Sequence, residues 1–196
     1  MVGNDVVDLA DPELRSGARH PRFDLRVFAP VERRVIDGAG EPNRMRWILW
    51  AAKEAAYKLA RKLDPETAFA PARFVVRLDE TFAGTVGHAG RELDVRVCAE
   101  GSAVHAIATD DPARRSRITS ALEATDEPLQ ASAAVRALAI RTLARRLGIP
   151  AAELSIGSRA RIPFGEVRGS ARRVDLSLSH HGRFVAVACD PGGHAR

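Results

Sequence analysis

One uninterrupted stretch, Arg46 to Lys62, constrains the fold more than any other part of the chain. It reads RWILWAAKEAAYKLARK, and no glycine or proline occurs until Asp64-Pro65 follows it. Apolar or small residues recur in it at helical spacing, at Trp47, Trp50, Ala51, Ala55 and Leu59. This period predicts a helix with one face against a core, and the Asp-Pro pair marks its end.

The charges on this helix allow two interpretations. Glu54 and Lys58 are four residues apart and so share a face, where an ordinary solvated ion pair would need no further explanation. However, the only three lysines of the chain, Lys53, Lys58 and Lys62, all fall in this helix, although the chain otherwise uses arginine. A lysine ammonium is compact and mobile and can follow a phosphate, so the clustering favours a chemical role.

The segment WAAKEAAYK also resembles the W-x-x-K-E-A-x-x-K signature of the 4'-phosphopantetheinyl transferases. These enzymes move the phosphopantetheine arm of coenzyme A onto a serine of a carrier protein. The resemblance implies that Glu54 and Lys58 are catalytic, with Glu54 taking the serine proton and Lys58 stabilising the pyrophosphate. It gives Lys53 a more peripheral part in binding coenzyme A.

A short strand is expected at Gly3 to Leu9, with Asp5 on an otherwise apolar face. Such an acid needs a partner or a metal, and capping of a nearby turn is the simpler alternative. The stretch resembles the family's G-x-D-I-x-x-I strand, which implies that Asp5 and Glu54 hold Mg²⁺. In the larger family type the acid two places on is a further ligand; Val7 stands there, so one more water is expected. Alternation points Asp8 away from Asp5, and we do not count it as a ligand.

The stretch Leu176 to Ala188, LSLSHHGRFVAVA, predicts two strands around a tight turn. Ser179 and His180 resemble the S-H pair of the family's N-x-S-H-S motif, and the resemblance implies that they contact coenzyme A phosphates. For His180 alone, a solvated turn histidine is the alternative. Arg161 begins an R-I-P triplet where the larger enzymes have G-K-P, which keeps a cation for coenzyme A.

Further elements complete an α+β pattern. They are a helix from near Pro30, strands at Phe74 to Leu78, Glu92 to Val97 and Ala103 to Ala108, a glycine-rich turn around Gly84 to Gly90, and an amphipathic helix at Ala131 to Leu147. The resemblance implies a pseudo-dimer of two halves, each a small antiparallel sheet packed on a long helix. Residues 1–110 carry the magnesium and catalytic motifs, 111–128 form a linker, and 129–196 carry the coenzyme A motif.

The order of these motifs differs from that of the larger, surfactin-synthetase-activating type, in which the S-H half comes first. The two halves therefore resemble those of that enzyme in circularly permuted order. We then expect the N-terminal strand to lie near the strand Phe184 to Cys189, with Asp190 to Arg196 as a short exposed tail. We also expect a monomer; chain ends on opposite sides would instead favour a dimer that shares sites between chains.

Composition narrows the function further. A formal net charge of +5 suits nucleic acid, but it equally suits an enzyme whose substrates, coenzyme A and an acidic carrier protein, are anions. Only 5% of residues are aromatic, so we do not expect a nucleic-acid partner. No apolar run could span a membrane or serve as a signal, which favours a cytoplasmic location. Cys98 and Cys189 lie in apolar strands, which predicts buried, reduced thiols.

The expected function is magnesium-dependent transfer of phosphopantetheine from coenzyme A to an acyl or peptidyl carrier protein, as in fatty acid or polyketide biosynthesis. The alternative is a catalytically inactive homologue that binds a carrier protein or nucleic acid.

Overall fold

The computed structural model describes residues 1–125, 130–171 and 173–194. The α-helices are α1 (Phe23–Val27), α2 (Pro30–Gly38), α3 (Pro42–Leu63) and α4 (Ala131–Leu147). The strands are β1 (Val2–Asp8), β2 (Val75–Leu78), β3 (Ala83–His88), β4 (Arg91–Glu100), β5 (Ala103–Thr109), β6 (Thr119–Ala124), β7 (Leu154–Arg159), β8 (Ile162–Val167), β9 (Arg173–His181) and β10 (Phe184–His194). None of the described helices is long and apolar enough to cross a membrane.

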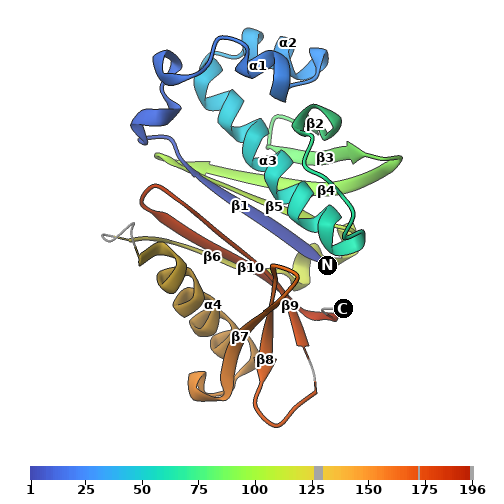
Figure 1. Cartoon of the computed structure of the whole chain (residues 1–196), viewed down its shortest axis with the longest axis vertical. Helices are drawn as coiled ribbons and strands as arrows, with labels where there is room; N and C mark the ends of the chain where they lie inside the picture. Colours follow the sequence, from blue (N-terminus) through green and yellow to red (C-terminus); the bar gives the residue numbers. More distant parts are fainter. Residues whose placement is uncertain (126–129, 172, 195–196) are drawn as a thin grey trace.

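The described strands form two five-stranded sheets. Their orders are β1-β5-β4-β3-β2 and β6-β10-β9-β8-β7, and all neighbouring strands are antiparallel. Helix α3 packs on the first sheet and α4 on the second, and the two halves meet where β1 lies beside β9 and β10 (Figure 1). This architecture confirms the predicted α+β fold of two halves, each an antiparallel sheet on a long helix.

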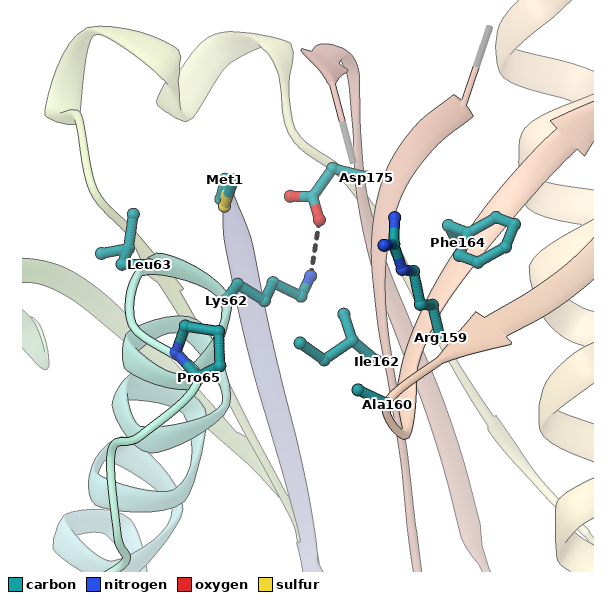
Figure 2. A pocket seen from close by; sticks show the side chains of 9 residues that line it. All are labelled: Met1, Lys62, Leu63, Pro65, Arg159, Ala160, Ile162, Phe164 and Asp175. Atoms are coloured by element: carbon teal, nitrogen blue, oxygen red, sulfur yellow. Dashed lines mark hydrogen bonds and ion pairs between the residues drawn. The ribbon is translucent and has the colours of Figure 1, made fainter. Parts of the chain in front are cut away.

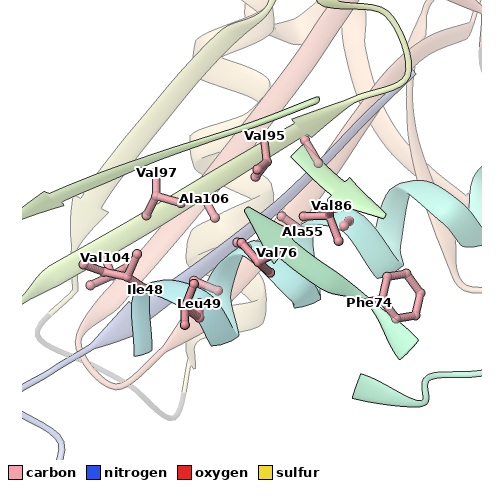
Figure 3. Packing of buried hydrophobic residues seen from close by; sticks show 14 of the residues in the cluster. Ile48, Leu49, Ala55, Phe74, Val76, Val86, Val95, Val97, Val104 and Ala106 are labelled. Atoms are coloured by element: carbon pink, nitrogen blue, oxygen red, sulfur yellow. The ribbon is translucent and has the colours of Figure 1, made fainter. Parts of the chain in front are cut away.

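The core of the first half fixes the position of α3. Ile48 and Leu49 of this helix pack with valines of the facing strands, as Figure 3 shows. Farther along, small buried side chains let the helix approach β1 closely. At Gly3 of β1, an added Cβ would lie only 2.1 Å from the carbonyl oxygen of Ala55, so glycine is needed at this crossing. The crossing sets the turn of α3 that carries Glu54 and Lys58 against the middle of β1.

The predicted turn around Gly84 to Gly90 is wrong in its extent. Strand β3 begins at Ala83, and only Ala89 and Gly90, both with positive φ, make the turn into β4. Gly84 lies within this strand. Glycine is needed there because an added Cβ would lie 2.0 Å from the carbonyl oxygen of Arg77 on β2. The glycine therefore serves a close approach between strands rather than a change of direction.

The stretch between the halves also differs from expectation. Strand β6 lies inside the segment 111–128 that was expected to be a linker, and it pairs with β10 at the edge of the second sheet. Strands β7 and β8 were not predicted. Residues 126–129, 172 and 195–196, which fall in the expected linker and second half, lie outside the described residues.

The predicted exposed tail from Asp190 is wrong. Strand β10 continues to His194 after an irregularity, and Asp190 is fully buried, where its carboxylate accepts a hydrogen bond of 3.0 Å from Arg114. Asp190 pairs with Asp175 of β9, and the Asp175 carboxylate accepts a bond from the amide of Val2 at 2.6 Å. Through Asp175, the beginning of β1 thus lies close to the later part of β10.

The cysteines are both free, but only Cys189 is buried. Burial raises the pKa of its thiol to about 12. Cys98 is exposed because the alternation of β4 turns it, together with Arg96, to the outer face of the sheet. The prediction of a buried thiol was therefore wrong for Cys98.

Candidate active site between the two halves

The seam between the halves is built on the free edge of β1. One edge of β1 pairs with β5, and the other edge faces side chains of β9. The amides of Val2, Asn4, Val6 and Asp8 donate, in that order, to the side chains of Asp175, Ser177, Ser179 and His181 at 2.6, 2.9, 3.1 and 3.1 Å. We call these four β9 side chains the β9 ladder. Its members alternate along the strand, so one face of β9 satisfies amides that an edge strand would otherwise leave unpaired.

Helix α3 covers the same seam with Glu54, Lys58 and Lys62, which recur every four residues and so share one face. The Lys58 ammonium donates to Asp5 Oδ1 at 2.7 Å, to the Asn4 carbonyl at 3.0 Å and to Ser179 Oγ at 3.2 Å. Lys58 is therefore paired with Asp5. No ion pair joins it to Glu54 among the described residues, contrary to the simpler interpretation of the sequence.

One turn farther along α3, Lys62 ties the beginning of β1 to β9. Its ammonium donates to the Val2 carbonyl at 2.6 Å, to Asp175 Oδ1 at 2.6 Å and to the Leu176 carbonyl at 2.8 Å. Lys62 and Asp175 are both buried. The pair anchors the seam beside the catalytic candidates.

Lys53 lies on another face of α3, in the core of the first half. Its ammonium donates to the Glu32 carboxylate at 2.7 Å and to the carbonyls of Pro71 and Phe74, and it is fully buried. The structure therefore places Lys53 away from the seam. All three lysines of the chain direct three donors at three acceptors, a geometry that a compact ammonium satisfies and a planar guanidinium does not. This explains why lysine replaces arginine at these positions.

Asp5 and Glu54 form an acidic pair in the seam. Asp5 is 8% exposed, and its Oδ1 also accepts a hydrogen bond of 2.8 Å from Ser179 Oγ. Burial raises the pKa of Glu54 to about 7; the charge of Asp5 adds to the rise and that of Lys58 opposes it. Glu54 makes no hydrogen bond or ion pair with any described residue, so its lone pairs are open.

His105 of β5 adds a buried neutral group to the same neighbourhood. Asn4 Nδ2 lies 3.2 Å from His105 Nε2, and Asn4 Oδ1 is buried without a partner among the described residues. Burial lowers the pKa of His105 to about 4, with Asp5 opposing this change and Lys58 adding to it. His105 is thus uncharged at neutral pH.

The structure brings together most, but not all, of the residues predicted for the site. Asp5, Glu54, Lys58 and Ser179 meet in the seam. His180 does not join them, because alternation turns it to the face of β9 that carries Leu176 and Leu178, where it is exposed. Asp8 also lies outside this cluster: Arg183 binds both of its carboxylate oxygens and holds its pKa down to about 2.

A groove runs from this cluster along α3 toward the hairpin of β7 and β8. A cavity of about 210 Å³ is lined by Lys58 and Arg61 of α3 and by Arg161 at the hairpin tip. Ala160 and Arg161 form that tip with positive φ angles of 49° and 64°, a conformation that costs energy for residues other than glycine. The hairpin thus holds Arg161 next to the Lys58 cluster despite backbone strain.

The groove continues into a second cavity of about 420 Å³ at the end of α3 (Figure 2). Its walls are largely apolar and include Leu63, Ile162 and Phe164, while Lys62 pairs with Asp175 at one side. The two cavities share Lys62 and Ile162 in their walls and so adjoin each other. Together they form a groove with a cationic part next to the acidic pair and an apolar part beyond it.

Several residues of the seam were missed by sequence reasoning. His105 is one histidine in an apolar strand, and nothing in its spacing connects it with Asn4. The Lys62–Asp175 pair joins residues that are 113 positions apart, so no local pattern could show it. The only sequence signal was the clustering of lysines in α3, which marked Lys62 without indicating its partner.

The comparisons with known proteins bear on the first half. A family model described as the 4'-phosphopantetheinyl transferase superfamily matches residues 1–110, which include β1, α3 and the acidic pair. No curated protein and no solved structure gave a match. Because the matched residues make up more than half of the 196 residues, the chain belongs to the 4'-phosphopantetheinyl transferase superfamily.

Proposed function

We propose that this chain transfers 4'-phosphopantetheine from coenzyme A to a serine of an apo acyl or peptidyl carrier protein and releases 3',5'-ADP. The observation that carries the proposal is the meeting of Asp5, Glu54 and Lys58 in one seam, beside a cation-lined groove. These are the residues that the family resemblance marks. The arrangement provides a carboxylate with open lone pairs, a fixed ammonium and a groove that could accept the pyrophosphate of coenzyme A.

The acidic pair fits a magnesium ion. Among the described residues, no group of three or more His, Cys, Asp or Glu side chains gathers at one point. Mg²⁺ commonly binds one or two carboxylates and completes its shell with water and substrate phosphates, so two acids suffice. Burial first and the charge of Asp5 second raise the pKa of Glu54, and a cation bound between the two acids would offset both effects. Asp5 and Glu54 would hold the ion, which when bound would neutralise charge on the pyrophosphate.

In the proposed reaction, the hydroxyl oxygen of the carrier serine attacks the β-phosphorus of coenzyme A. The bond from that phosphorus to the bridging oxygen breaks, and 3',5'-ADP departs with the bridging electrons. Glu54, whose carboxylate makes no hydrogen bond to a described residue, accepts the serine proton. Lys58, held by three protein acceptors, contributes a fixed positive charge at the wall of the groove.

Coenzyme A would lie along the groove. Arg61 and Arg161 line the same cavity as Lys58, and their charges suit its phosphates. The apolar cavity beyond them, walled by Ile162 and Phe164 (Figure 2), suits the purine base. In this orientation the pantetheine arm points away from the apolar cavity and toward the acidic pair.

The carrier protein would dock on α1 and α2. Leu25, Val31 and Val35 are exposed there, at 61%, 39% and 46%, and exposed Arg22 and Arg26 flank Leu25. Exposed apolar side chains and arginines on these two helices are complementary to an acidic partner that also offers apolar contacts. We further propose that the chain acts as a monomer with permuted halves, because β1, α3 and β9 of one chain supply the whole seam.

The test is coenzyme A turnover with an apo carrier protein and Mg²⁺, followed by chromatography of released 3',5'-ADP. We expect release that depends on both carrier and metal and that is lost in Glu54→Gln. Glu80→Gln, which changes an exposed acid in the loop between β2 and β3, is the matched control and should retain release. Tight carrier binding without release of 3',5'-ADP would instead support the alternative, an inactive homologue that binds carriers.

A further inference from the structure

The hydroxyl of Ser179 is fully used inside the protein. A serine hydroxyl has one donor and two acceptor positions. Ser179 Oγ donates to Asp5 Oδ1 at 2.8 Å, and it accepts from the Val6 amide at 3.1 Å and from Lys58 Nζ at 3.2 Å. The residue is only 6% exposed. Its single O–H donor is already given to Asp5, so none remains for a phosphate oxygen unless that bond breaks.

These three partners belong to the first half, whereas Ser179 belongs to the second. Two of them, Asp5 and Lys58, are members of the proposed catalytic cluster. The third, the Val6 amide, fixes the backbone next to Asp5. Ser179 therefore holds the carboxylate, the ammonium and the strand that carries the carboxylate in one fixed relation. The other members of the β9 ladder accept amides of β1 but make no hydrogen bond with Asp5 or Lys58.

We propose that Ser179 is a positioning residue, through which the second half orients Asp5 and Lys58, and that it does not bind coenzyme A phosphate. The proposal rests on the proposed function for the reaction that this geometry serves. It assigns the S-H pair a different task from the one its resemblance implies, since His180 lies on the opposite face of β9. Catalytic competence of the first half then depends on a hydroxyl that the second half supplies.

The first test is Ser179→Ala in the full chain, with kcat, KM for coenzyme A and the dissociation constant of coenzyme A measured separately. Loss of a group that orients metal ligands lowers activity on the order of 10-fold to 100-fold. We expect this loss in kcat, with the dissociation constant of coenzyme A by calorimetry changed less than about twofold. Ser179→Thr keeps the hydroxyl and should restore most of kcat.

His181→Ala is the control for loss of a ladder bond. His181 Nδ1 accepts a hydrogen bond from the amide of Asp8, and His181 makes no hydrogen bond or ion pair with Asp5, Glu54 or Lys58. The His181→Ala substitution should lower stability without the fall in kcat that we expect for Ser179→Ala. If the two alanine variants lost activity in proportion to their loss of stability, Ser179 would be a structural contact only. Weaker coenzyme A binding at unchanged kcat in Ser179→Ala would show that the hydroxyl binds phosphate, and would overturn the proposal.

A second readout does not need turnover. Mn²⁺ alone, titrated by its effect on water proton relaxation, reports the acidic pair without coenzyme A or carrier. We expect Ser179→Ala to weaken Mn²⁺ affinity and Ser179→Thr and His181→Ala to leave it near wild type. This result in a protein that showed no transfer would reject the proposed function while keeping the positioning role. Equal Mn²⁺ affinity in wild type and Ser179→Ala would reject the positioning role.

Discussion

Replacing Glu54 with glutamine should make the fold more stable at neutral pH in the absence of metal. The pKa of this carboxyl rises from 4.5 to about 7 in the folded protein, chiefly because it is buried. Each pKa unit corresponds to about 1.4 kcal/mol, so folding with an ionised Glu54 costs about 3 kcal/mol. Glutamine has nearly the same shape and carries no charge, so this cost disappears.

The direction in which the free energy of unfolding changes with pH follows from proton binding. Between pH 4.5 and 7 the folded Glu54 keeps a proton that the unfolded chain has lost, so the free energy of unfolding falls as pH rises through this window. His105 acts in the opposite direction. Its pKa is lowered from 6.5 to about 4, so its contribution to stability is present above pH 6.5 and is lost as pH falls toward 4. The two slopes oppose each other in wild type, and only the difference between variant and wild type isolates Glu54.

The assay is urea unfolding in EDTA from pH 4 to 8 for wild type, Glu54→Gln and Glu80→Gln. We expect the free energy of unfolding of Glu54→Gln to exceed that of wild type by little below pH 4.5. This difference should grow by about 3 kcal/mol by pH 7.5. Glu80→Gln should show no such growth, because Glu80 is exposed. A difference that stayed flat from pH 4.5 to 7.5 would show that Glu54 ionises like a surface acid, and would refute the reasoning.

Three further predictions concern the seam and the docking face. Lys62→Met should lower the free energy of unfolding by about 3–5 kcal/mol in urea titrations, because it leaves the buried Asp175 carboxylate without its ion-pair partner. Asp8→Asn, which removes the Arg183 pair, should be less stable than wild type at pH 7, and this difference should shrink as pH falls from 3.8 toward 2. Leu25→Asp should raise KM for an acidic carrier roughly tenfold at unchanged kcat, as a loss of ~1.4 kcal/mol would, and equal KM values would exclude α1 from docking.

Much of the fold could be predicted because its main elements carry local periodic signals. Helices α3 and α4 and the β9–β10 hairpin show clear helical spacing or alternation. Strand β3 was missed because Gly84 and Gly87 look like turn residues, although Gly84 is required by the approach of Arg77. Strand β6 was missed because its partner, β10, lies far along the chain.

The candidate site was predictable where chemistry is carried by short motifs. Asp5, Glu54 and Lys58 could be named because their residue types and spacing match a recognisable signature. The motif could not show that Lys53 turns to Glu32 in the core, since that depends on which side of α3 faces the seam. It also could not show the saturation of the Ser179 hydroxyl, which arises from contacts across two halves.

The most direct test of the proposed function is the intact mass of an apo carrier protein after incubation with coenzyme A, Mg²⁺ and this protein. We predict a mass gain of one phosphopantetheine arm, located on a serine by fragmentation, and no gain with EDTA or with Glu54→Gln. A carrier whose mass is unchanged by the wild-type protein, across acyl and peptidyl carriers that a known transferase modifies in parallel, would contradict it.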